Sequence, residues 1–304
     1  MDILSGVLNT ILGSSIIVGV VFPLIFFGLM DFLFRYFSVK IPFQNVFLYT
    51  SLGGVIGMSV LSYFLFGINI ETASDIFTQK TFYIGMLLGV LWTLAIFSMG
   101  FAYEKLNANG AQIIPIASAS GLLTSVLSVT LLKETGNLTV LFISAFIIFC
   151  GVIFLQKAKI TNAVDKINFL SILVGGIIPL LSFGILNTLF KAYYELNSGA
   201  LGIIMGIVGI VLSLLVQFLR KQKLIFEPKL LLTGVVWAIA VASLGYGFYP
   251  LLGQASVLLP IAGASPLISV VLVAIFLDEK VNWKYIIMGS LLIFSGVISL
   301  HIFL

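Results

Sequence analysis

Charge is scarce in this sequence. Only 9% of its 304 residues are Asp, Glu, Lys or Arg, whereas 61% are hydrophobic and the mean hydropathy is +1.23. Soluble globular domains carry about 25% charged residues. A chain so poor in charge is excluded from that class, and its composition indicates an integral membrane protein that the bilayer solvates.

Cysteine and histidine are scarce as well, with Cys150 and His301 the single residue of each kind. One cysteine excludes a disulfide within the chain and a cysteine-based metal cluster, and a lone histidine is not a metal site. The apolar runs also lack the clustered acids, or the histidine paired with a carboxylate, that a membrane enzyme needs. We therefore expect no enzymatic activity, no metal and no cofactor. Although the net charge is +4, no nucleic-acid motif occurs.

What the sequence does contain is a series of long apolar runs. A membrane span takes about 20 largely apolar residues, so ten spans leave room only for short loops. Charged or turn-forming stretches, such as 133–137 and 220–223, mark the aqueous ends. The expected helices are 11–37, 43–67, 82–104, 109–132, 137–156, 168–194, 199–219, 229–252, 255–277 and 282–303. The fold class is therefore predicted to be all-α, with ten transmembrane helices and no sizeable soluble domain.

The second half of the chain repeats the first. A shift of 145 positions aligns 92–155 with 237–300 without a gap, and 22 of the 64 pairs are identical. A second match, at a shift of 156, aligns the helices that contain Pro23 and Pro179. The chain therefore divides into two repeats, 1–160 and 161–304.

Each repeat contains five expected helices, and this odd number has a topological consequence. The second repeat must enter the membrane from the side on which the first one ended, so the two halves are inverted. Inverted repeats recur in secondary transporters, where two near-equal packings of the halves open one central site to alternate sides.

The most specific stretches of the repeat run from a proline to an acidic residue, 115–134 and 260–279, each followed by a helix that ends in Gly-Val-Ile. An aromatic residue and a glycine, Phe27-Gly28 and Phe183-Gly184, precede a basic residue by seven positions. In these features the chain resembles the ten-helix EamA-type members of the drug/metabolite transporter superfamily, over nearly its whole length. Phenylalanine stands twice where the family commonly has tryptophan. The resemblance implies a pore between the halves, lined by helices 1 to 4 and 6 to 9, and no defined substrate.

The candidate substrate-binding residues are polar, ionisable or aromatic groups within the expected spans. The candidate helix breaks are prolines, which remove a backbone donor and free a carbonyl, or else simply begin a helix. The binding candidates are Asp31, Trp92, Tyr103, Ser120, Thr124, Asn187, Trp237, Tyr246, Tyr249, Ser265 and Ser269, and the break or gating candidates are Pro23, Pro115, Pro179 and Pro260.

These candidates have alternative interpretations. The hydroxyls can line a cavity or bond back to their own helix carbonyls. Trp92 and Trp237 lie halfway along their helices, which favours a packed core or a pocket wall over an interfacial anchor. Asp31 and Asn187 each have a basic residue four positions later, and Asp31 is the better candidate for substrate binding or proton coupling because an ionisable group within a span is costly.

We expect a secondary transporter of a small metabolite, such as an amino acid or a sugar, in the cell membrane. The alternative is a flippase or exporter for lipids or lipophilic drugs that uses the same groove. The expected partners are the solute and the bilayer, and both a monomer and a homodimer stay open. Orientation also stays open, because 12 of the 15 Lys and Arg fall opposite the termini, whereas relatives of the resembled family usually have cytoplasmic termini.

Overall fold

Helices make up the secondary structure of the described part of the chain. The computed structural model describes residues 17–38, 41–68, 72–106, 116–117, 119–134, 137–157, 169–221, 223–248, 255–276 and 282–303. No strand occurs within these ranges. The all-α prediction is confirmed.

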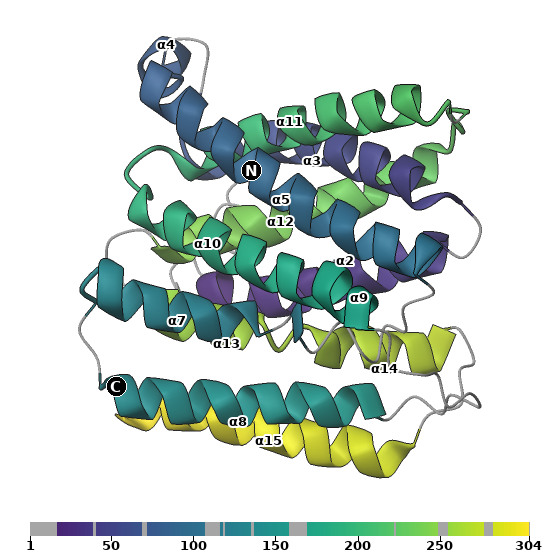
Figure 1. Cartoon of the computed structure of the whole chain (residues 1–304). Coiled ribbons are helices and arrows are strands. Elements are labelled where there is room, and N and C mark those ends of the chain that lie inside the picture. Colours follow the sequence, from purple (N-terminus) through teal and green to yellow (C-terminus); the bar gives the residue numbers. More distant parts are fainter. Residues whose placement is uncertain are drawn as a thin grey trace, which may run out of the picture.

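The helices lie side by side with roughly aligned axes (Figure 1). The long ones are α2 (Phe22–Ser38), α3 (Phe43–Leu65), α5 (Gln79–Lys105), α8 (Leu138–Lys157), α10 (Ile178–Ala192), α11 (Ser198–Leu219), α12 (Leu231–Phe248) and α15 (Trp283–Phe303). The shorter ones are α4 (Ala73–Ile76), α7 (Ser120–Leu131), α9 (Phe169–Ile172), α13 (Ala255–Ala262) and α14 (Pro266–Phe276). Two π-helical turns, η1 (Ile17–Val21) and η2 (Leu173–Ile177), precede α2 and α10, and a 3-10 turn, η3 (Pro228–Leu230), precedes α12.

Five helical segments are long and apolar enough to cross a membrane, judged by length and composition. They are Phe43–Leu65, Gln79–Lys105, Phe169–Ala192, Ser198–Leu219 and Pro228–Phe248. Five shorter apolar helical stretches accompany them: Val18–Phe34, Ser120–Leu131, Leu138–Phe154, Leu258–Ser269 and Trp283–Gly296. Several helices of this kind are compatible with a membrane protein.

Polar residues fix where several helices begin. The Asn197 side chain accepts hydrogen bonds from the backbone N–H groups of Gly199 and Ala200 at the start of α11. Asn137 accepts in the same way at the start of α8, and Asn282 at the start of α15. An asparagine at this position satisfies donors that have no partner within the helix.

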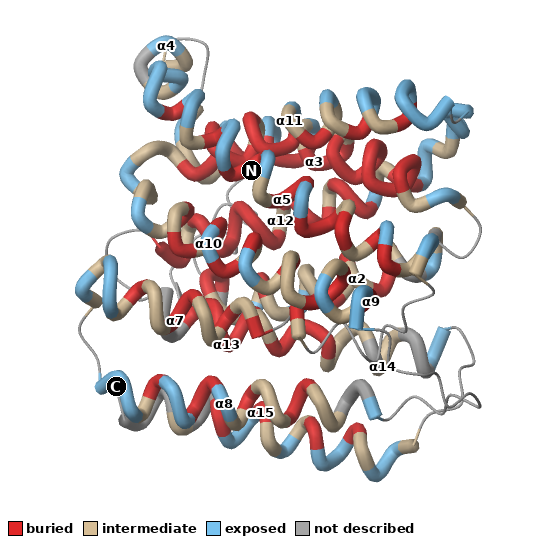
Figure 2. Tube along the Cα trace, in the orientation of Figure 1, coloured by how far each residue is buried: buried red, intermediate tan, exposed pale blue. Residues whose placement is uncertain are grey.

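The burial pattern is compatible with a protein whose exterior faces lipid. Large apolar side chains such as Phe64 and Phe218 are 70% and 81% exposed, whereas polar Thr50, Ser51 and Asn45 are fully buried. Figure 2 shows buried residues concentrated on α3 and α12, in the interior of the bundle. Thr50 and Ser51 donate to carbonyls one turn earlier, so their burial leaves no hydroxyl unbonded.

Glycines bring α3 and α12 into backbone contact. A Cβ on Gly57 would lie 2.7 Å from the Cβ of Ala238, and one on Gly54 would lie 2.6 Å from the ring of Trp237. Because Gly234 has no side chain, α12 packs directly against the backbone carbonyl of Thr50 in α3. Small residues at such crossings allow the close approach on which helix association in lipid depends.

One predicted helix, 255–277, is interrupted. α13 ends at Ala262, a turn covers residues 263–265, and α14 begins at Pro266. Pro266 has no N–H to donate to the preceding turn, so the backbone tightens, with Ser265 N–H bonded to the Ala262 carbonyl at 3.0 Å. The first residues of predicted helix 109–132 lie outside the described residues, and its regular part, α7, begins at Ser120.

Candidate functional site

Two tryptophans meet at the centre of the bundle. Trp92 of α5 and Trp237 of α12 stack with ring centroids 4.5 Å apart and an interplanar angle of 21°. They are 3% and 2% exposed. Two roles were expected for these residues, a packed core or a pocket wall. The structure shows them in a packed core.

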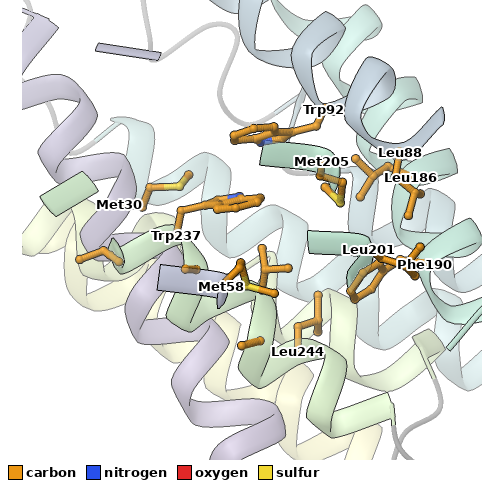
Figure 3. Close-up of a cluster of buried hydrophobic side chains, with 14 of the residues drawn as sticks. Met30, Met58, Leu88, Trp92, Leu186, Phe190, Leu201, Met205, Trp237 and Leu244 are labelled. Atoms are coloured by element: carbon orange, nitrogen blue, oxygen red, sulfur yellow. The ribbon is translucent and has the colours of Figure 1, made fainter. Parts of the chain in front are cut away.

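An apolar shell surrounds the stack (Figure 3). Met30 comes from α2, Met58 from α3 and Met205 from α11, while Leu186 and Phe190 come from α10. Methionine side chains are flexible and polarisable, so they adapt to surfaces of different shape. The centre is therefore an apolar contact among six helices.

Among the candidate hydroxyls, Thr124 bonds both to its own helix and to a neighbouring one. Thr124 of α7 donates to the Ser120 carbonyl at 2.9 Å and to the Gly184 carbonyl of α10 at 3.3 Å. Ser120 and Ser269 are half-buried, and Ser265 is buried in the turn before α14. Thr124 thus both bonds back and links two helices.

Asp31 lies within α2, is half-buried, and has no hydrogen bond or ion pair in the described part of the chain. The side chain of Arg35, one turn later, lies outside the described residues. Asn187 of α10, at the repeat-equivalent position, is half-buried as well. An unpaired charge in apolar surroundings is costly, so Asp31 is a candidate for binding a cationic group.

The Lys191 side chain bonds to a backbone carbonyl at the end of α12. Its ammonium group donates to the carbonyl of Phe248 at 3.4 Å and lies 4.9 Å from the Tyr194 ring and 5.3 Å from the Phe248 ring. Phe248 is the last residue of α12, where a helix dipole favours a cation. Lys191 therefore fastens the end of α10 to the end of α12.

Two further aromatic candidates lie away from the middle of their helices. Tyr103 and Tyr246 are half-buried, near the ends of α5 and α12, and each has an interaction partner. Tyr249 lies outside the described residues. The expected aromatic site therefore consists, in the described residues, of Trp92 and Trp237 within the shell of Figure 3.

Two of the four proline candidates adjoin helix irregularities. Pro23 and Pro179 are each the second residue of an α-helix and follow the π-helical turns η1 and η2. Pro260 lies inside α13, and Pro115 lies outside the described residues. π-helical turns are rare and frequently mark functional positions, so these irregularities are candidates for hinges.

A polar cluster at one end of the bundle, with buried amides and exposed charged groups, escaped sequence reasoning. The Glu104 carboxylate accepts hydrogen bonds from the Phe43 N–H and the Gln44 side-chain amide, each at 3.2 Å, and lies 4.0 Å from the Arg220 guanidinium. Gln217 donates to the Gln44 carbonyl at 3.3 Å. The signal for this cluster was two consecutive amide side chains, Gln44 and Asn45, at the start of an otherwise apolar helix.

The site contains no metal-binding group in the part of the chain that the structure describes, since no three His, Cys, Asp or Glu side chains converge there. The polar residues near the centre are separate hydroxyls, one amide and one carboxylate.

The fold and this site define a helical protein with an apolar exterior. Over 131 residues the chain is 30% identical to an uncharacterized protein of Methanocaldococcus jannaschii, and the match covers 42% of this chain and 93% of that protein. The chain belongs to the family of that archaeal protein. No protein-family model matches the sequence.

A solved structure has the same fold. A crystal structure described only as that of a protein superposes with a TM-score of 0.75 at 16% sequence identity, over 94% of this chain and 96% of the other. At this identity the similarity concerns the fold alone.

Proposed function

We propose that this protein is a secondary transporter of a small solute, built from ten transmembrane helices in two inverted five-helix repeats, as in EamA-type drug/metabolite transporters. The observation that carries the proposal is that contacts between helices recur when repeat-equivalent residues are exchanged. Trp92 and Trp237 are repeat equivalents and contact each other directly. Two equivalent residues touch when they lie next to an axis that exchanges the halves.

The outer helices α8 and α15 obey the same relation. A Cβ on Gly151 would lie 2.7 Å from the Gly289 carbonyl oxygen and 2.8 Å from Ile293. A Cβ on its equivalent, Gly296, would lie 2.7 Å from the Ser144 carbonyl oxygen and 2.6 Å from Ile148, which are the equivalents of those two residues.

The inner helices repeat this correspondence. Gly28 of α2 packs on Ile268 of α14, and Gly184 of α10 packs on Leu123 of α7. Exchanging the halves converts the first contact into the second. The π-helical turns Ile17–Val21 and Leu173–Ile177 correspond at the same shift of 156 positions.

The archaeal relative is consistent with duplication. Since 42% of this chain covers 93% of it, that protein is less than half as long as this chain, close to one repeat. A family with members of about one repeat and members of two repeats is consistent with a fold assembled from two copies of one unit.

The proposed mechanism is alternating access. The solute binds between the halves near Trp92 and Trp237, and the π-helical turns and the break before α14 allow the halves to change packing. The binding residues are those expected from the sequence, with Asp31 as the ionisable group that binds a proton or a cationic part of the solute. Its counterpart Asn187 is neutral, so the two halves contribute different chemistry.

Counterflow in proteoliposomes tests this proposal. Vesicles are preloaded with amino acids, sugars, phosphorylated sugars or lipophilic cations, and uptake of the labelled compound is compared with that of protein-free vesicles. Saturable exchange within one class is the expected result. Absence of exchange in every class, with correctly folded protein, contradicts it.

Replacing Asp31 with Asn tests the role of the carboxylate. We expect D31N to abolish uptake driven by a pH gradient, while the Glu104→Gln variant, which removes a carboxylate at the end of the bundle, retains it. Unchanged pH dependence in D31N would reject Asp31 as the coupling residue.

A flippase for lipids or lipophilic drugs is the second candidate, favoured by the apolar shell of Met30, Met58 and Met205 around the tryptophans. It predicts transfer of fluorescent phospholipids between leaflets in the same vesicles. Fast lipid transfer without solute exchange would select this function.

A further inference from the structure

The connection between α11 and α12 combines exposed apolar side chains with cations. Phe218 and Phe226 are both 81% exposed, and Leu224 is 57% exposed. Lys221, Lys223 and Lys229 are exposed along the same connection, with no ion pair in the described residues. The tube in Figure 2 is pale blue where this connection leaves α11.

The connection is held against the bundle, so its exposed side chains have a fixed direction. The Ile225 N–H donates to the Asn45 side-chain oxygen at 3.1 Å, and Asn45 is fully buried at the start of α3. The Phe226 ring lies 6.4 Å from the Tyr49 ring in an edge-on arrangement. At the start of the connection, the Lys221 N–H donates to the Phe218 carbonyl.

The acidic residues near this connection form no ion pair with the three lysines in the described part of the chain. The carboxylate of Glu104 lies 4.0 Å from Arg220 and also accepts bonds from α3. Glu227 is half-buried, in the turn before α12. Three lysines with a net positive field therefore stand beside apolar side chains.

We propose that this connection binds the head groups of anionic phospholipids in the leaflet at this end of the bundle. Apolar side chains flanked by cations are typical of segments that lie in the interface, where the rings enter the acyl boundary and the cations meet phosphate groups. Each lysine near an anionic surface strengthens binding about fivefold. The inference rests on the placement of the chain in a membrane and is independent of what it transports.

The test measures lipid selectivity directly. The full-length protein is reconstituted in phosphatidylcholine bilayers, and the association of spin-labelled phosphatidylglycerol is compared with that of spin-labelled phosphatidylcholine. The test variant is K221Q/K223Q/K229Q. The matched control is K105Q/K157Q/K284Q, which removes the same charge from other exposed lysines near helix ends.

We expect the wild type and the control to prefer the anionic lipid, and the test variant to lose at least about fivefold of this preference. In the Phe226→Trp variant, brominated phosphatidylglycerol should quench the added fluorescence more than brominated phosphatidylcholine does. Equal losses in the test and control variants, or no preference in the wild type, would overturn the proposal. Circular dichroism of each variant verifies the fold, and a failure of solute exchange leaves the result unaffected.

Discussion

The Trp92–Trp237 stack should make a measurable pairwise contribution to stability. Both rings are almost fully buried, so replacing either with Ala should cost about 3–5 kcal/mol. The rings also interact directly at 4.5 Å, which in aromatic pairs contributes about 0.5–1.5 kcal/mol beyond buried area. The double variant W92A/W237A should therefore lose less than the two single losses added together, by about 1 kcal/mol.

The assay is unfolding by SDS in mixed micelles, followed by far-UV circular dichroism, on the wild type, both single variants and the double variant. Leu141 belongs to the separate cluster between α8 and α15 and is fully buried, so the cycle of L141A with W237A is the matched control. That control should be additive within about 0.5 kcal/mol. An additive result for the tryptophan cycle, or an equal coupling in the control, would refute the reasoning.

Three further predictions use the same unfolding assay. Gly151→Val and Gly296→Val should each cost about 1–3 kcal/mol, and by similar amounts, because each new side chain meets a carbonyl oxygen at 2.7 Å; a neutral result for either one would contradict this. Glu104→Gln should cost about 1 kcal/mol because it weakens the bonds that Glu104 makes at the start of α3. Arg220→Gln should cost less than about 0.5 kcal/mol because its ion pair is long and partly exposed. Equal losses in the two variants would contradict this prediction. Thr124→Val should lose only about 0.6 kcal/mol, the average for hydrogen bonds between membrane helices, and a loss above about 2 kcal/mol would assign Thr124 a larger structural role.

Most helix positions could be predicted because apolar runs and capping residues are local signals. The expected helix 199–219 begins one residue late, since Asn197 caps a helix that starts at Ser198. The interruption at residues 263–265 was not expected, although Pro260, Gly263 and Pro266 are all in the sequence. Prolines are tolerated inside membrane helices when other groups satisfy the freed carbonyls, so their presence alone does not locate a break.

The candidate site could be predicted only in part. The repeat alignment identifies Trp92 and Trp237 as equivalents, but whether equivalents touch depends on where the halves meet, which no local pattern states. Lys191 donates to the Phe248 carbonyl, and residue identity does not indicate which backbone carbonyl will be the acceptor. The cluster around Glu104 also could not be predicted, because it forms where the ends of three helices lie together in the folded protein.

The stacked indoles also give the protein a built-in optical probe. Two aromatic chromophores at 4.5 Å couple their electronic transitions, and the coupling produces a near-UV dichroic signal that depends on their separation and angle. Any rearrangement that slides α5 past α12 changes that signal without an attached label. Trp283, 56% exposed and outside the pair, contributes a background that a Phe substitution removes. Near-UV dichroism of the intact, unlabelled chain therefore reports whether the packing of α5 against α12 changes when candidate solutes are added.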